Sequence, residues 1–286
     1  MGVSYGVSAG ADKSYVSLSG LQGNLERLQL LEDLWTNAKA DQETYDKYVA
    51  RILKSRADGK TQKQNILWNG LFSYGKYGEN SRLRNIYTAD ELQSMDPDEL
   101  VQILKELKGY KQRLFYYGNN VAQTEKALNK NYILAQDLKE YPEPIVYKEL
   151  ETGNAVNYVD YDMVQAEMIF VSKGDVFDKQ KLARSQVFNT YFGSGLSSIV
   201  FQEIRESKSL AYSAFASYSN AGKMGDSNYT YAYVGTQANK LTQAVDAMLE
   251  LMNEMPEAQE QFESAKEATL KKIASQRITK SNIFWQ

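Results

Sequence analysis

The sequence of 286 residues contains no histidine and no cysteine. The absence of cysteine excludes disulfides and thiolate chemistry. The absence of histidine excludes hydrolase sites in which an imidazole activates a serine or a cysteine. Catalytic zinc usually needs imidazole or thiolate among its ligands, and this chain offers only carboxylates and carbonyls. Acidic residues such as Asp12 and Asp46 show no ligand spacing, so we expect no metal site within the chain.

Long apolar runs and a strong charge of either sign are also absent. No stretch of about 18 apolar residues is present, so we expect no membrane-spanning helix. Residues 1–20 lack a basic start and an apolar core, so we expect no signal peptide in this chain. The formal net charge of -3 gives no electrostatic reason to expect a nucleic-acid partner. A hydrophobic content of 43% and a charged content of 24% fit a globular protein of two domains.

The pattern of apolar residues, caps and turns predicts a mixture of strands and helices. Strands are expected at residues 3–9, 15–21, 111–118, 155–161, 165–171, 210–218 and 229–235. Helices are expected at residues 24–36, 41–56, 96–108, 178–192, 239–255 and 256–280. A turn at Asp58-Gly59 is expected to separate the second of these helices from another that continues through Trp68.

Residues 191–218 are the most informative stretch of the chain. Gly193 and Gly195 break the preceding helical pattern, as glycines do where the backbone must leave the helical region. Ser197 or Ser198 can cap the next helix, which carries apolar residues on one face. That helix closes with an arginine and a glutamate, and a strand rich in tyrosine and phenylalanine follows it.

This stretch resembles the second half of the pitrilysin (insulinase-type) zinc metallopeptidases, which include the mitochondrial processing peptidases and bacterial zinc proteases. Their pattern is a glycine-rich turn, a helix ending in Arg-Glu, and a Leu-Ala-Tyr sequence separated from the Arg-Glu pair by three residues. The three parts stand here as Gly193-Ser194-Gly195, Arg205-Glu206 and Leu210-Ala211-Tyr212. The linked spacing carries the resemblance, because either the arginine or the tyrosine alone would be a weak signal.

The resemblance implies an α+β fold of two homologous domains, each a mainly antiparallel sheet with helices packed largely on one face. It implies a catalytic role for Tyr212, whose phenol would donate to the oxyanion or to the substrate carbonyl. Arg205 would bind a substrate carbonyl or carboxylate. Gly193 and Gly195 would form a turn beside the substrate.

The family's His-x-x-Glu-His zinc motif is impossible here, so this chain is expected to hold no cofactor and to be inactive alone. The resemblance implies that zinc belongs to the full-length enzyme, in an N-terminal half of the same protein or in a partner subunit. A peptide is the expected substrate. Exposed strand edges make a homo-oligomer a further expectation. The resemblance favours the periplasm or cell envelope as the location.

Three short blocks recur in the same order near the two ends of the chain. Gly20–Asn24 matches Gly235–Asn239, Gln42–Asp46 matches Gln259–Glu263, and Lys63–Trp68 matches Lys280–Trp285. The offset stays between 215 and 217 residues, which is the length of a whole domain. A weaker match, which needs a gap, places Val3–Tyr5 opposite Leu210–Tyr212.

The repeat predicts where the domains begin and end. Residues 1–136 are expected to be the C-terminal part of one peptidase-like repeat domain. Residues 137–150, with Pro142 and Pro144, are the expected linker. Residues 151–286 are then the N-terminal part of the next repeat domain. The chain is thus expected to be a piece of a longer protein and to cover the last two of four homologous domains.

Two other functions compete with that of a peptidase part. A non-catalytic relative would serve as a structural or substrate-holding partner, and a third alternative is a peptide-binding module without an enzymatic partner. The chain has 21 tyrosines, so any single tyrosine is more often structural than catalytic. The presence of both Arg205 and Tyr212 favours the peptidase. The glycine-rich turn lacks the Lys-Ser/Thr pair of a phosphate loop, which disfavours nucleotide binding.

Overall fold

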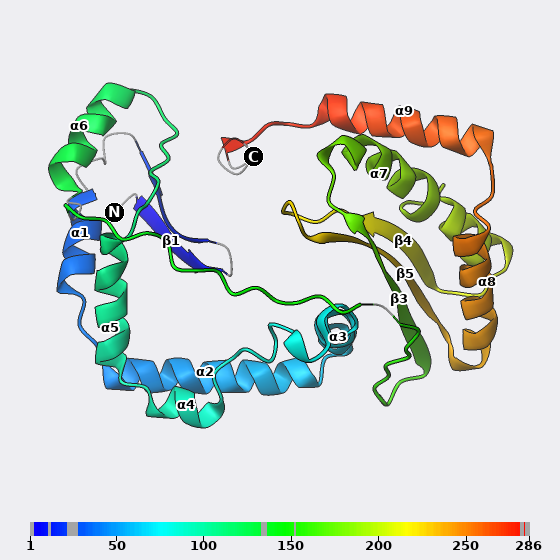
Figure 1. Ribbon diagram of the computed structural model, residues 1–286, viewed down its shortest axis with the longest axis horizontal. Helices are drawn as coiled ribbons and strands as arrows, with labels where there is room; N and C mark the ends of the chain where they lie inside the picture. Colours follow the sequence, from blue (N-terminus) through cyan, green and yellow to red (C-terminus); the bar gives the residue numbers. More distant parts are fainter. Residues whose placement is uncertain are drawn as a thin grey trace. The chain divides into compact units, whose positions relative to one another are not determined.

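The computed structural model describes residues 3–10, 13–21, 28–132, 136–151, 153–280 and 283. The chain forms two compact units. Unit 1 comprises Met1–Arg56, Tyr87–Val146 and Ile278–Gln286, and unit 2 comprises Ala57–Ile86 and Tyr147–Arg277. Each unit combines an antiparallel sheet with helices, which confirms the predicted α+β class (Figure 1). The boundaries of the repeat domains stay a prediction.

Unit 1 contains one hairpin and several helices. Its elements are β1 (Val3–Ala9), β2 (Ser14–Gly20), α1 (Leu28–Asn37), α2 (Gln42–Lys60, which ends in unit 2), α4 (Ala89–Ser94), α5 (Pro97–Glu106), η4 (Leu107–Gly109) and α6 (Val121–Asn131). The expected start of α5 is confirmed, because the side chain of Asp96 accepts a hydrogen bond from the backbone N–H of Asp98. The expected start of the first helix at Asn24 lies outside the described residues.

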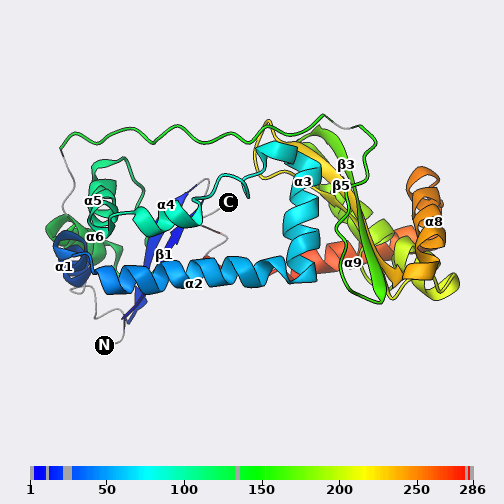
Figure 2. The ribbon, with the colours of Figure 1, turned by 90° about the horizontal axis from the view of Figure 1, so that it is seen from below.

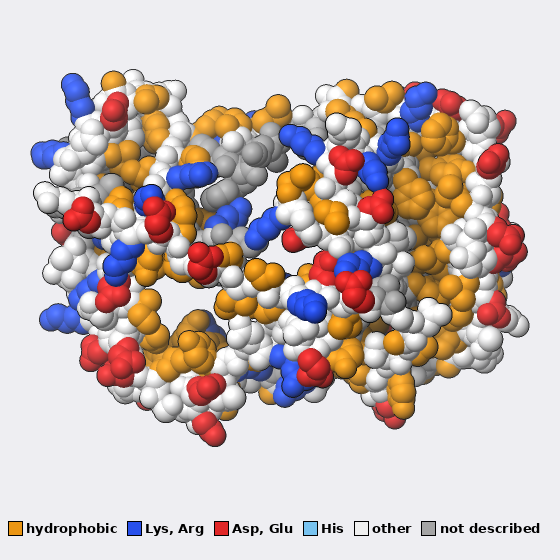
Figure 3. Space-filling model, in the orientation of Figure 1, with side chains coloured by type: hydrophobic (Ala, Val, Ile, Leu, Met, Phe, Trp, Pro, Cys, Tyr) orange, Lys and Arg blue, Asp and Glu red, His pale blue; other side chains and the backbone are white. Residues whose placement is uncertain are grey.

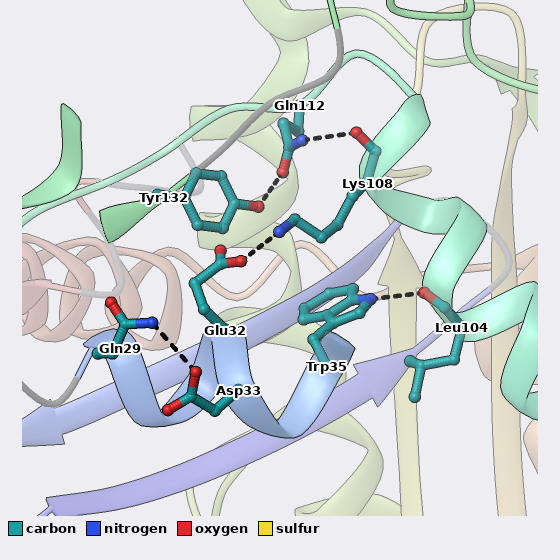
Figure 4. Close-up of polar contacts among 8 residues, drawn as sticks. All are labelled: Gln29, Glu32, Asp33, Trp35, Leu104, Lys108, Gln112 and Tyr132. Carbon is teal, nitrogen blue, oxygen red and sulfur yellow. Dashed lines mark hydrogen bonds and ion pairs between the residues drawn. The ribbon is translucent and has the colours of Figure 1, made fainter. Parts of the chain in front are cut away.

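Polar contacts, most of them part-buried, join α1 to α5 and to η4, and the residue after α6 to the segment after η4 (Figure 4). The carboxylate of Glu32 and the ammonium of Lys108 form an ion pair that is mostly buried. The phenol of Tyr132 donates to Gln112 beside this pair. Burial is the main cause that raises the pKa of Tyr132, and the charge of Glu32 adds to it. The indole of Trp35 donates to the carbonyl of Leu104 over 2.6 Å.

Unit 2 contains a three-stranded sheet. Its elements are η2 (Asn65–Leu71), α3 (Phe72–Tyr77), η3 (Gly78–Asn80), β3 (Gln165–Val176), η5 (Lys179–Lys181), α7 (Leu182–Phe188), η6 (Asn189–Gly193), η7 (Phe201–Ser207), β4 (Ser213–Ser219), β5 (Ser227–Gln237), η8 (Ala238–Lys240), α8 (Leu241–Asn253) and α9 (Gln259–Ser275). The strand order is β3-β5-β4, and both pairings are antiparallel.

Most helices of unit 2 cover one face of its sheet, as predicted (Figures 1 and 2). Small and branched side chains point from the strands into this core, and helices supply the larger ones. The fully buried members include Ala216, Val234, Val200, Ile204 and Met248. A fixed, close-packed layer therefore lies directly behind the motif of residues 191–218.

The opposite face of the same sheet is aromatic and is covered by η2 and α3. The indole of Trp68 stacks on Phe215, with ring centres 5.9 Å apart and an interplanar angle of 9°. Tyr233 lies 5.7 Å from the same indole, and Phe72 meets Tyr231 edge-on at 5.5 Å. Such contacts between aromatic rings add to the burial of apolar area. Residues 65–77 thus pack against the sheet of unit 2.

Three predicted elements are wrong. α2 continues through Gly59 to Lys60, because one glycine costs a long helix only about 1 kcal/mol. Residues 111–117 are irregular, and the backbone pairs there only through a single bridge between Tyr110 and Lys139. The described residues between 155 and 161 form no strand either, and Val156 is exposed. A segment with strand-like composition forms a strand only where a second strand lies beside it and pairs with it.

The order strand, strand, helix, helix occurs twice, as β1-β2-α1-α2 and as β4-β5-α8-α9. When Gly20 is placed on Gly235, as in the sequence repeat, the two ladders can be compared residue by residue. With this alignment they place Tyr5 on Phe215, whereas the weaker sequence match places Tyr5 on Tyr212. The repeat itself stays a prediction.

The charges of the surface are mixed. Figure 3 shows basic and acidic side chains interspersed over the visible face, without a large area of one sign. Within the part of the chain that the structure describes, no helix is both long and apolar enough to cross a membrane.

Candidate functional site

The turn before η7 is built by two glycines with different tasks. Gly195 has a φ of +98° and an open surrounding, so it supplies a backbone conformation that other residues rarely adopt. Gly193 is buried, and a Cβ at its position would lie 1.9 Å from the carbonyl oxygen of Ala216. Gly193 therefore allows η6 to touch the backbone of β4. The predicted contact of both glycines with substrate stays a prediction.

Ser198 fixes the start of the next helical segment, in agreement with one of the two predicted caps. Its hydroxyl donates to the carbonyl of Gly195 over 2.8 Å. The same oxygen accepts the backbone N–H of Phe201 at 3.4 Å. Ser198 is fully buried, so this small network sets the direction in which η7 leaves the turn.

The edge of β4 is partly closed by η6. The side chain of Asn189 accepts the backbone N–H of Tyr218 at 2.6 Å and donates to the carbonyl of Tyr218 at 3.0 Å. The side-chain amide of Asn189 thus makes the two backbone hydrogen bonds that a neighbouring strand would otherwise make at this position. Together with the contact between Gly193 and Ala216, it leaves this part of β4 without a free edge for an added peptide strand.

The corner between η7 and β4 is held at several backbone atoms. The N–H of Leu210 donates to the carbonyl of Ile204 over 2.9 Å. The hydroxyl of Thr236 donates to the carbonyl of Leu210, and the ammonium of Lys240 donates to that of Ser209 over 3.1 Å. Ser209 has a φ of +49°, which few residues other than glycine adopt. The corner is thus a specified turn rather than a loose loop.

Tyr212 stands at the end of this corner, immediately before β4. Its backbone N–H donates to the carbonyl of Gly235 over 2.9 Å, and 54% of its surface is exposed. The phenol oxygen accepts a hydrogen bond of 2.7 Å from the side-chain amide of Gln237. Because the oxygen is the acceptor in this contact, the O–H of Tyr212 is free to donate to another group.

Arg205 lies in the last turn of η7, next to the fully buried Ile204. Its guanidinium carbon lies 4.8 Å from the centre of the Phe201 ring, a distance typical of cation–π contacts. Its Nε lies 3.6 Å from the carboxylate of Glu206, and 45% of the side chain is exposed. The packing against Phe201 orients the guanidinium, and its exposed nitrogens can bind a carbonyl or carboxylate.

The residues of this chain do not fit a zinc ion. Among the described residues, no group of three or more histidine, cysteine, aspartate or glutamate side chains could hold a metal. A shallow groove of unit 2 lies near η7 and α8 and is lined by Lys208, Leu210, Gln243, Asp246, Ala247 and Glu250. Arg205 and Tyr212 do not line this groove, although Leu210 of the corner between η7 and β4 does.

Sequence reasoning missed three residues that hold the motif in place, two at the corner and one at the edge of β4. Gln237 stands in the Gly-Thr-Gln block of the repeat, but nothing in the sequence indicated that it reaches the phenol of Tyr212. Asn189 and Lys240 act across 29 and 31 residues respectively. Their roles depend on the tertiary structure, and no local signal shows them.

Residues 94–269 match the protein family described as "Peptidase M16 inactive domain". No curated protein matches the chain. A solved protease from Helicobacter pylori has 15% identity and a TM-score of 0.65 over 99% of this chain and 70% of that one. A peptidase M16 inactive domain from Pseudomonas fluorescens has 14% identity and a TM-score of 0.62 over 96% and 68%.

A third similar structure is a ferredoxin protease in complex with Arabidopsis ferredoxin. It has 13% identity and a TM-score of 0.68, and the alignment covers 95% of this chain. The chain spans only 30% of the length of that protease. At such low identities, the likeness to the three structures concerns the fold.

Proposed function

Because the chain belongs to the family described as the Peptidase M16 inactive domain, we propose that it is the substrate-binding part of a zinc-dependent metallopeptidase. The zinc site would lie in another part of the protein or in a partner subunit, since the residues here do not fit the metal. A peptide is the proposed substrate. The resemblance of the 191–218 stretch to pitrilysin-type peptidases agrees with the family match.

The observation that carries this proposal is the free hydrogen-bonding capacity at one fixed corner. Tyr212 and Arg205 are both exposed, while the residues around them are held by the core and by backbone hydrogen bonds. The O–H of Tyr212 would donate to the oxygen of the peptide carbonyl under attack, where negative charge develops. The guanidinium of Arg205 would hold a second carbonyl or a carboxylate of the substrate with parallel hydrogen bonds.

A cleavage assay of the full-length protein tests the proposal. Unlabelled peptide mixtures would be incubated with and without a chelator, and products read by mass spectrometry. We expect cleavage that the chelator abolishes. Arg205→Lys keeps the charge but loses the planar fork, so it should raise KM by roughly tenfold, or about 1.4 kcal/mol, with a smaller change in kcat. Cleavage that persists with the chelator, or an unchanged KM, would contradict the proposal.

A non-catalytic partner remains the second candidate. The absence of histidine and cysteine from the whole sequence fits both functions, because neither requires this chain to hold the metal. This function requires that the full-length protein bind peptides, or its partner, without cleaving them. Peptide binding without any chelator-sensitive cleavage would therefore select it over the peptidase.

A further inference from the structure

The side chain of Gln237, the last residue of β5, contacts the phenol of Tyr212. Its amide nitrogen donates to the phenol oxygen over 2.7 Å, although the two residues are 25 positions apart in the sequence. Both residues are exposed on unit 2. The contact therefore joins the end of a central strand to the side chain that is proposed to act on the substrate.

The backbone around Gln237 is held at the same corner as Tyr212. The preceding residue, Thr236, is fully buried, and its hydroxyl donates to the carbonyl of Leu210. Gln237 itself pairs with Gln165 of β3, and η8 begins directly after it. The backbone N–H of Tyr212 donates to the backbone of β5. Both ends of the side-chain contact thus start from backbone that the sheet holds in place.

The direction of this hydrogen bond decides what the phenol can do. A phenol has one proton to donate and lone pairs that accept. The amide of Gln237 takes up a lone pair of Tyr212, which leaves the proton for another acceptor. A hydrogen bond accepted by the oxygen also polarises the O–H and makes it a better donor. An acceptor in the place of this amide would instead take the proton for itself.

We propose that Gln237 is a positioning residue for Tyr212, whose amide keeps the O–H directed at the peptide carbonyl. This rests on the proposed function, in which Tyr212 donates to that carbonyl. A donor that is already oriented needs no rearrangement when negative charge develops on the carbonyl oxygen. Gln237 acts through the phenol, so its loss should slow cleavage and leave peptide binding almost unchanged.

Three substitutions of Gln237 in the full-length protein separate the direction of the proton from the shape of the side chain. Gln237→Glu keeps the shape, but its carboxylate only accepts at neutral pH, so kcat should fall roughly a hundredfold with little change in KM. Gln237→Met removes the donor without adding an acceptor and should lose roughly tenfold. Gln237→Lys supplies a donor again and should recover most of the loss seen with Met. A Met variant as active as the Lys variant would overturn the proposal.

The pH dependence of Gln237→Glu gives a second readout, which a purely structural role would not change. A glutamate with an ordinary pKa of about 4.3 is protonated in about a sixth of the molecules at pH 5 and can then donate. The ratio of its kcat to that of the unmodified protein should therefore rise roughly tenfold between pH 7 and pH 5. Gln165→Glu places the same charge on the neighbouring strand, and its ratio should stay near one. A flat ratio for Gln237→Glu would contradict the proposal.

Nuclear magnetic resonance of the 286-residue chain tests the contact without any cleavage. With ¹⁵N-labelled glutamine, the side-chain signal of Gln237 is the one that disappears in Gln237→Met. Tyr212→Phe keeps the ring but removes the acceptor, so this signal should shift and its protons should exchange faster with water. An unchanged signal would overturn the positioning role. If Tyr212→Phe leaves kcat unchanged, the proposed function fails; if it lowers kcat and Gln237→Glu does not, the positioning role alone fails.

Discussion

The close approach of Gly193 to the backbone of Ala216 predicts how much the added methyl group of Gly193→Ala lowers stability. Gly193→Ala puts a Cβ 1.9 Å from the backbone carbonyl oxygen of Ala216, and both residues are buried. No side chain can rotate away, so η6 must move off β4 by more than 1 Å to reach an ordinary contact distance. Overpacking of this kind costs 1–3 kcal/mol or more, and we expect about 3 kcal/mol here. For a unit of this size, that lowers Tm by roughly 6–12 °C.

Calorimetry on the purified chain measures this change, and another glycine of unit 2 is the control. Gly222 lies in the loop between β4 and β5, and a Cβ there meets no atom within 4 Å. Gly222→Ala should change stability by less than about 0.5 kcal/mol. A Tm of Gly193→Ala within about 2 °C of the unmodified chain would refute the packing argument. A raised KM of the full-length variant, at temperatures where it is folded, would support the predicted substrate contact of Gly193.

Two further predictions concern buried polar groups. Glu32→Gln leaves the ammonium of Lys108 without its partner and should lower the free energy of unfolding, measured in urea, by about 3–5 kcal/mol. Glu43→Gln, which breaks the exposed pair with Lys47, should lower it by less than about 1 kcal/mol. Equal losses in the two variants would contradict the argument that the buried pair contributes more. Burial, with the charge of Glu167 as a lesser cause, raises the pKa of Tyr233 to about 12. Between pH 10 and 12 the unfolded chain loses the phenol proton of Tyr233 and the folded chain keeps it, so the free energy of unfolding should fall by up to about 1.4 kcal/mol per pH unit. Tyr233→Phe should make this fall with pH shallower. The same slope in the variant and the unmodified chain would contradict the raised pKa.

Helix signals in the sequence were reliable where they were local. Asp96 followed by Pro97 predicted the start of α5, and the side-chain cap is present. Ser198 predicted the start of the segment that carries Arg205. Each of these depends on residues within one turn of the chain. The fold class followed from the family resemblance more than from such patterns.

Strands and the site were harder, because they depend on distant parts of the chain. Residues 155–161 have the composition of a strand, yet the described ones pair with no neighbour. The contact between Gln237 and Tyr212 joins residues 25 apart, and the close approach of Gly193 to Ala216 appears only when the helix lies on the sheet. Arg205 and Tyr212 could thus be predicted as candidates from the sequence, whereas the residues that hold them in place are visible only in the tertiary structure.

The role of Tyr212 is the central claim, and one substitution tests it most directly. Tyr212→Phe removes only the phenol oxygen of a half-exposed side chain, so the fold and the shape of the site should persist. If the O–H stabilises developing charge on the substrate, the full-length variant should lose roughly a hundredfold in kcat, with little change in KM. An unchanged kcat would contradict the account.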